Sequence, residues 1–192
     1  MALELLSEGS DLFASERFEQ AAKTLRQAKA VASRSATIRE LLGLAAYNVE
    51  LWEEALRELR TYRRLSGETT HMPEEMDCLR GLGRPADVDK TWQIFQELGG
   101  SRITEDEARV VYGSHLLDRG QLRDAWEVVR PGRLVAQAPP STLRKWFVAA
   151  RIALAGGDLE TATTLHKAIS KQDAEVPGLA ELAAQLADAR RR

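Results

Sequence analysis

The chain has 192 residues, of which 44% are hydrophobic and 29% are charged, and its formal net charge is −2. This length and composition belong to a folded chain with one compact domain or one repeat array, and they exclude an intrinsically disordered protein. The small net charge excludes a general electrostatic attraction to nucleic acid or anionic membranes.

The single cysteine, Cys78, cannot form a disulfide within the chain, which favours a reducing compartment. The first residues lack the basic segment of a secretory signal. The longest apolar run, Leu41 to Tyr47, is shorter than the roughly 18 residues that a membrane helix needs. We therefore expect a cytoplasmic protein with no membrane partner.

Apolar residues recur every three or four positions from one end of the chain to the other, which predicts an all-α fold. Two columns of mostly small residues divide the helices into repeats, with identical intervals of 34, 33, 37 and 37 residues. The first column is Gly9, Gly43, Met76, Gly113 and Ala150, and the second is Ala21, Ala55, Val88, Ala125 and Ala162. Because small residues let two helices approach closely, the columns predict antiparallel helix pairs.

This pattern resembles the tetratricopeptide repeat family, whose 34-residue unit is a helix–turn–helix. The best match is LLGLAAYNVELWEEALREL, residues 41–59, where Gly43, Trp52 and Ala55 occupy the positions of the family pattern. The resemblance implies a small stand-alone bacterial protein whose residues 1–192 form one right-handed α-solenoid of about five repeats. The expected repeats cover residues 2–34, 36–68, 70–100, 104–138 and 140–174, and a capping helix covers residues 177–191.

The third repeat departs from the family pattern, since Met76, Pro85 and Val88 replace a small residue, an aromatic residue and an alanine. Pro85 is compatible with the first turn of a helix, where its missing N–H is not needed. Breaks between helices are expected at residues 98–101, 130–132 and 139–140. At the start of the fourth repeat, Thr104 followed by Glu107 has the spacing of a capping box.

No group of residues indicates catalysis, a metal site or a cofactor. The sequence GLGRPA, residues 81–86, resembles a dinucleotide-binding loop but lacks the preceding strand that such a loop requires, so we interpret it as a turn between helices. The three histidines lie far apart in sequence and have no cysteine pair nearby, unlike the local ligand pairs of zinc sites. We therefore expect a protein that is not an enzyme.

Four arginines occur in the stretch ALRELRTYRRLSG at residues 55–67, namely Arg57, Arg60, Arg63 and Arg64. Acidic residues accompany them, and Glu53 lies one turn before Arg57, in the orientation that favours an ion pair. A phosphate-binding patch needs uncompensated positive charge, so we interpret this face as the solvated side of a helix. An accessory nucleic-acid or phosphate site on this face, together with Arg80 and Arg84, is the alternative function; a protein-docking face also stays open.

The resemblance implies that a peptide or protein partner binds in a concave groove lined by the first helix of each repeat. The residues expected to line that groove are Phe13, Glu40, Leu44, Tyr47, Asn48, Asp77, Arg80, Ser114, Phe147 and Arg151. One subtype of the family, the chaperone-binding clamp, grips a terminal carboxylate with Lys, Asn and Arg. The corresponding positions here hold Leu6, Ser10, Leu41, Thr70 and Glu74, so we do not expect a partner of that class. The sequence therefore predicts a non-catalytic interaction scaffold, and a homodimer stays open.

Overall fold

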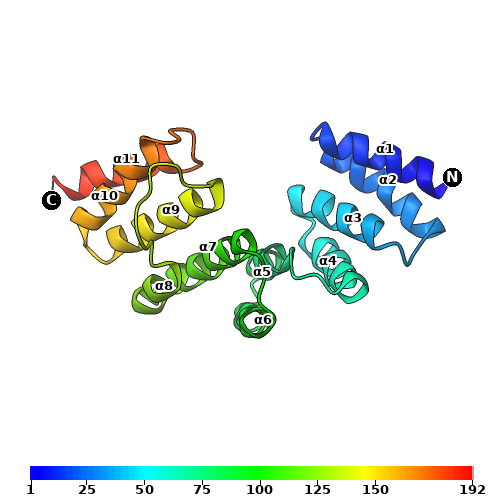
Figure 1. The fold of residues 1–192 in the computed structure, drawn as a ribbon, viewed down its shortest axis with the longest axis horizontal. Coiled ribbons are helices and arrows are strands. Elements are labelled where there is room, and N and C mark those ends of the chain that lie inside the picture. The colour runs from blue at the N-terminus through cyan, green and yellow to red at the C-terminus, as the bar shows by residue number, and fades with distance from the viewer. Residues whose placement is uncertain (192) are drawn as a thin grey trace. The chain divides into compact units, whose positions relative to one another are not determined.

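The computed structural model describes residues 1–191, which form eleven α-helices and no β-strand (Figure 1). The predicted all-α fold is confirmed. The chain divides into two compact units, one of residues 1–100 and one that begins at Ser101. The single continuous array expected from the sequence therefore stays a prediction, and each unit is described by itself.

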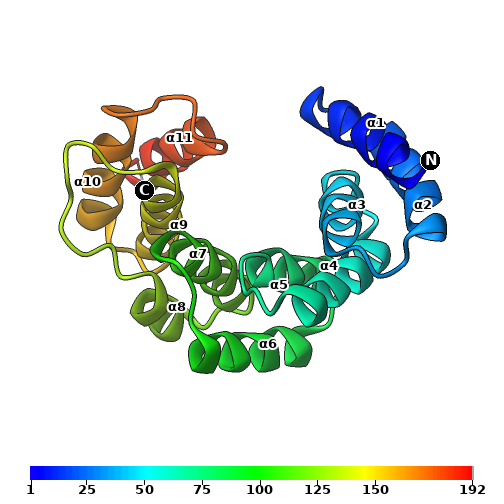
Figure 2. The same cartoon turned by 45° about the vertical axis from the view of Figure 1, so that its right-hand side comes forward.

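Unit 1 consists of three antiparallel helix pairs. Its helices are α1 (Ala2–Ala14), α2 (Phe18–Val31), α3 (Ala36–Asn48), α4 (Trp52–Ser66), α5 (Met72–Gly81) and α6 (Pro85–Leu98). Helices α1, α3 and α5 occupy one side of the unit, and α2, α4 and α6 occupy the other (Figure 2). Each expected repeat of residues 2–34, 36–68 and 70–100 contains one helix pair.

Unit 2 consists of two further helix pairs and a terminal helix. Its helices are α7 (Arg102–Asp118), α8 (Leu122–Val129), α9 (Pro140–Ala155), α10 (Leu159–Ser170) and α11 (Leu179–Ala189). Helix α8 ends directly before Arg130-Pro131-Gly132, where the sequence predicted a break. Helix α11 packs against α9 and α10 and lies within the range expected for a capping helix.

The glycine column marks the places where paired helices touch. A Cβ atom at Gly9 would lie 2.7 Å from the side chain of Leu25, and one at Gly43 would lie 2.7 Å from Leu59. A Cβ atom at Gly113 would overlap the side chain of Val129. The close helix approach predicted from the small residues is therefore present in both units.

The third repeat forms its helix pair despite its unusual sequence. Met76 and Val88, at the two positions where small residues stand in other repeats, are fully buried. Pro85 is the first residue of α6, where the fixed φ of proline suits a helix start. The substitutions therefore change the packing of this pair and leave its architecture in place.

Helix α7 begins differently from the prediction. Its N-cap is Ser101, whose side chain accepts a hydrogen bond of 3.1 Å from the backbone N–H of Thr104. Thr104 is a buried residue inside the first turn, so the expected capping box of Thr104 and Glu107 is wrong. Ser101 is the last residue of the break expected at residues 98–101, so the helix begins directly after that break.

Candidate partner-binding face

Seven of the ten predicted groove residues belong to α1, α3 and α5. These three helices form one side of unit 1 (Figure 2). Phe13 of α1 and Leu44 of α3 are half-buried, so each leaves part of an apolar side chain in contact with solvent. The ring of Phe13 packs edge-on against Phe18, with ring centroids 5.2 Å apart. This contact holds one apolar group of the face in a fixed position.

Tyr47 links α3 to α5. Its hydroxyl donates a hydrogen bond of 2.8 Å to Asp77, and its ring packs edge-on against Trp52, with ring centroids 5.6 Å apart. Burial raises the pKa of Tyr47, and the Asp77 carboxylate raises it further, so the hydroxyl stays protonated and donates. Tyr47 is therefore held from two directions while part of its ring stays accessible.

The guanidinium of Arg80, another of the predicted groove residues, already pairs with a carboxylate of its own helix. Its Nη1 atom lies 2.5 Å from Asp77, the same carboxylate that accepts the bond from Tyr47. The two residues are one turn apart on α5, which places them side by side on the helix surface. Tyr47, Asp77 and Arg80 therefore form one connected polar group.

Glu40 and Asn48 also have partners within unit 1. Glu40 lies 2.9 Å from Nε2 of His71, a contact that spans α3 and the start of α5. Exposed Asn48 donates its side-chain amide to the carbonyl of Leu44, one turn earlier. The importance of His71 was missed, because its partner lies 31 residues away in sequence and no local pattern indicates the contact.

The three predicted groove residues of unit 2 differ in exposure. Ser114 on α7 is only 8% exposed, and Phe147 on α9 packs against Gly178, the residue before α11. A Cβ atom at Gly178 would lie 2.7 Å from the Phe147 ring. The assignment of Ser114 to an open groove is therefore wrong, because this residue is buried. Phe147 is half-buried, so its place in the groove stays a prediction. Arg151 is exposed, as the groove assignment requires.

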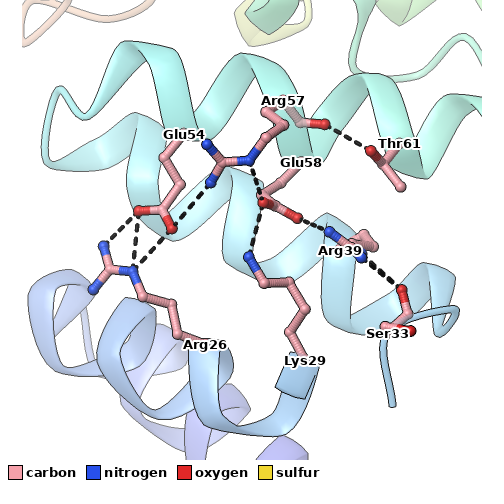
Figure 3. Close-up of polar contacts among 8 residues, drawn as sticks. All are labelled: Arg26, Lys29, Ser33, Arg39, Glu54, Arg57, Glu58 and Thr61. Carbon is pink, nitrogen blue, oxygen red and sulfur yellow. Dashed lines mark hydrogen bonds and ion pairs between the residues drawn. The ribbon is translucent and has the colours of Figure 1, made fainter. Parts of the chain in front are cut away.

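The arginine stretch on α4 contains a buried carboxylate, that of Glu58 (Figure 3). Glu58 is 0% exposed and receives ion pairs from Lys29 of α2 at 3.0 Å, Arg39 of α3 at 2.5 Å and Arg57 of α4 at 3.0 Å. Burial opposes the ionisation of Glu58, but the hydrogen bonds from Arg39 and Lys29 outweigh burial and hold its pKa below the ordinary value. Arg57 also pairs with Glu54 at 3.6 Å, one residue from the expected partner Glu53.

Two more arginines of the stretch pair with a second buried carboxylate. Arg63 donates two hydrogen bonds to Glu75 of α5, at 2.8 and 3.2 Å, and Arg60 lies 3.6 Å from the same group. Arg64 is exposed. The interpretation of this stretch as a merely solvated face is therefore incomplete. Arg57 pairs with a buried acid of its own helix, and Arg60 and Arg63 join α4 to α5 at a second buried acid.

The remaining candidates for chemistry have structural explanations. Burial, followed by the charge of Asp77, raises the pKa of the Cys78 thiol to about 12, far from the value of a reactive thiolate. GLGRPA forms the turn between α5 and α6, as predicted. Within residues 1–191, no cluster of His, Cys, Asp and Glu is arranged to hold a metal ion, and no helix is long and apolar enough to cross a membrane.

Two hollows in unit 2 share the half-buried Trp126 of α8. One, of about 320 Å³, lies between α8 and the end of α9, and the other, of about 240 Å³, lies between α8, α10 and residues 131–134. The second hollow depends on an irregular segment, so the sequence pattern gave no indication of it.

Comparison with known proteins shows similarity in structure alone. No protein-family model matches the sequence, and no curated protein matches it. The fold is similar to YrrB, described as a TPR protein with an unusual peptide-binding site, with 16% identity, a TM-score of 0.62, and coverage of 100% of this chain and 93% of YrrB. It is also similar to TTC0263, a TPR protein of Thermus thermophilus, with 14% identity, a TM-score of 0.68 and full coverage of both chains. The chain therefore has the tetratricopeptide repeat fold.

Proposed function

We propose that this protein is a non-catalytic interaction scaffold that binds a peptide segment or protein surface on the α1, α3 and α5 side of unit 1. The fold supports this proposal, because helical repeat arrays commonly present one side of their stacked helices to partners. The similarity to YrrB, whose description names a peptide-binding site, adds support from a protein of the same fold.

The observation that carries the proposal is the set of accessible apolar groups on this face. Phe13, Leu44 and Tyr47 are each half-buried, and Phe18 and Trp52 hold the two aromatic rings in place. Side chains ordered before binding lose little conformational entropy on binding, and buried aromatic anchors dominate the energy of many interfaces. We therefore expect these three residues to supply most of the binding energy.

The alternative of a nucleic-acid or phosphate site has weaker support. Arg57, Arg60 and Arg63 pair with Glu54, Glu58 and Glu75. Arg80 and Arg84 pair with Asp77 and Asp87. Binding to phosphate would require these ion pairs to break, which removes the electrostatic gain on which nucleic-acid affinity depends.

Site-specific photo-crosslinking in cells tests the proposed face. A photoreactive residue in place of Leu44 should form a defined adduct with a partner, and a second copy of this chain would be recognised by the mass of that adduct. The matched control carries the same residue in place of Glu53, which is exposed on α4. Equal adducts from both positions, or none from Leu44, would contradict the proposal.

A further inference from the structure

His71 lies at the junction of the second and third repeats. It is the N-cap residue of α5, and its side chain is only 12% exposed. Three groups from three helices face its ring: Glu40 of α3, Tyr62 of α4 and Glu74 of α5. The ring of Tyr62 packs against the imidazole, with the two ring centroids 5.4 Å apart.

The two ring nitrogens each face a carboxylate. Nε2 lies 2.9 Å from Oε1 of Glu40, and Nδ1 lies 3.7 Å from Oε2 of Glu74. Nδ1 and this Oε2 atom are both buried and have no hydrogen-bond partner among the described residues. A neutral imidazole carries one N–H, so it can donate to only one of the two glutamates and must turn a lone pair toward the other.

Only the imidazolium form carries an N–H toward both carboxylates. We propose that His71 is a proton-operated tie between repeats two and three, in which the protonated ring joins Glu40 of α3 to Glu74 of α5. Loss of the proton leaves one glutamate facing an unprotonated nitrogen and releases that half of the tie. Because α3 and α5 also carry Tyr47 and Asp77, the tie fixes these helices at the proposed partner-binding face.

The surroundings of His71 favour the protonated form. Burial alone would lower the pKa of His71, but the nearby carboxylates of Glu74 and Glu40 outweigh burial, and the pKa lies above its ordinary value. A histidine whose pKa is higher in the folded than in the unfolded chain stabilises the fold when it is protonated. This stabilisation is complete at pH values below the unfolded-state pKa of about 6.5, and it is lost as the pH rises through the folded-state pKa. The tie is therefore closed in mildly acidic solution and opens toward alkaline pH.

An NMR titration of the His71 imidazole in the full chain tests the tie without a partner, so its outcome is separate from that of the proposed function. The wild-type ring should titrate above the ordinary histidine value, and Glu40→Gln and Glu74→Gln should each move it downward. These substitutions remove one charge and keep the shape of the side chain. A pKa of His71 at or below the ordinary histidine pKa, or one that neither substitution changes, would overturn the proposal.

Urea unfolding provides the second readout, because a merely structural histidine would give the same loss at every pH. The urea midpoint of His71→Gln should fall below that of the wild type at pH 6 and approach it at pH 9. His166→Gln, a change at a half-buried histidine of α10, is the control and should show no such convergence. A constant difference between the wild type and His71→Gln across this range would contradict the proposed tie.

Discussion

At the scale of single residues, the carboxylate of Glu58 connects three helices of unit 1. It is fully buried on α4 and contacts cations from α2, α3 and α4 (Figure 3). A buried charge is tolerated only when it is paired, and removing one partner of a buried pair costs far more than breaking a surface pair. Glu58 therefore holds the first and second repeats together in a way that depends on its ionisation.

We predict that Glu58→Gln lowers the free energy of unfolding by about 3 kcal/mol at pH 7, because Lys29 and Arg39 lose their buried counter-charge. The pKa of Glu58 is lower in the folded than in the unfolded chain. The ionised carboxylate therefore stabilises the fold at pH values above the unfolded-state pKa of about 4.3, and this contribution disappears as the pH falls through the folded-state pKa. The difference in the free energy of unfolding between the wild type and Glu58→Gln, measured by urea unfolding, should therefore shrink below about pH 4.

The control for this substitution is Glu53→Gln on the same helix. Glu53 is exposed, so its replacement should change the free energy of unfolding by no more than about 0.5 kcal/mol. Equal effects of the two substitutions at pH 7 would show that Glu58 behaves as a surface residue.

The sequence could predict that the arginines near Glu58 are balanced by acids, but it could not predict which pairs form. Ion pairs such as Arg26 with Glu54 and Lys29 with Glu58 join residues 28 and 29 positions apart. Local spacing identified Glu53 as the partner of Arg57, whereas the structure pairs Arg57 with Glu54 and Glu58. Such contacts depend on how one repeat packs on the next, which helical periodicity alone does not determine.

At the scale of secondary-structure elements, one position in the turn between paired helices has a positive φ in every repeat. These residues are Glu16, Glu50, Gly83, Gly120 and Gly157, and their φ angles lie between 58° and 81°. Their spacing repeats the intervals of the small-residue columns. Glycine reaches this conformation without steric cost, whereas any other residue is strained there.

We predict that Glu50→Gly stabilises the protein by about 0.5–1 kcal/mol, because it removes the strain of a side chain in the left-handed region. The same change at Glu53, in the first turn of α4, should destabilise the protein by about 1 kcal/mol. It replaces a good helix former with glycine and removes a negative charge that favours the helix N-terminus. Thermal unfolding of the two variants should therefore shift in opposite directions. A loss of stability in both would contradict the strain assigned to the turn.

Helix pairs were the part of the fold that the sequence predicted best. Gly9, Gly43 and Gly113 each lie where a Cβ atom would meet the facing helix, as their spacing implied. The candidate face was predicted less well, because exposure depends on what covers a helix. Ser114 has a suitable position within its repeat, but the packing of unit 2 buries it.

At the scale of the whole molecule, the similarity to YrrB and TTC0263 establishes the tetratricopeptide repeat fold at 16% and 14% identity. So low an identity is compatible with the fold because the repeat requires close helix contacts and turns rather than particular surface residues. The surface residues are free to differ, so the partner must be inferred from the accessible side chains of this chain. The three proposed anchors, Phe13, Leu44 and Tyr47, belong to α1 and α3 of unit 1.

The most direct test of this account is the affinity of the partner captured through Leu44, measured by calorimetry for the wild type and two variants. Leu44→Asp places a charge among the apolar groups of the face and should weaken binding at least tenfold, about 1.4 kcal/mol. Glu53→Lys changes the exposed charge of α4 by more and should leave the affinity unchanged, with the helical content of both variants checked by circular dichroism. Unchanged affinity in Leu44→Asp, or equal losses in both variants, would contradict the proposed binding face.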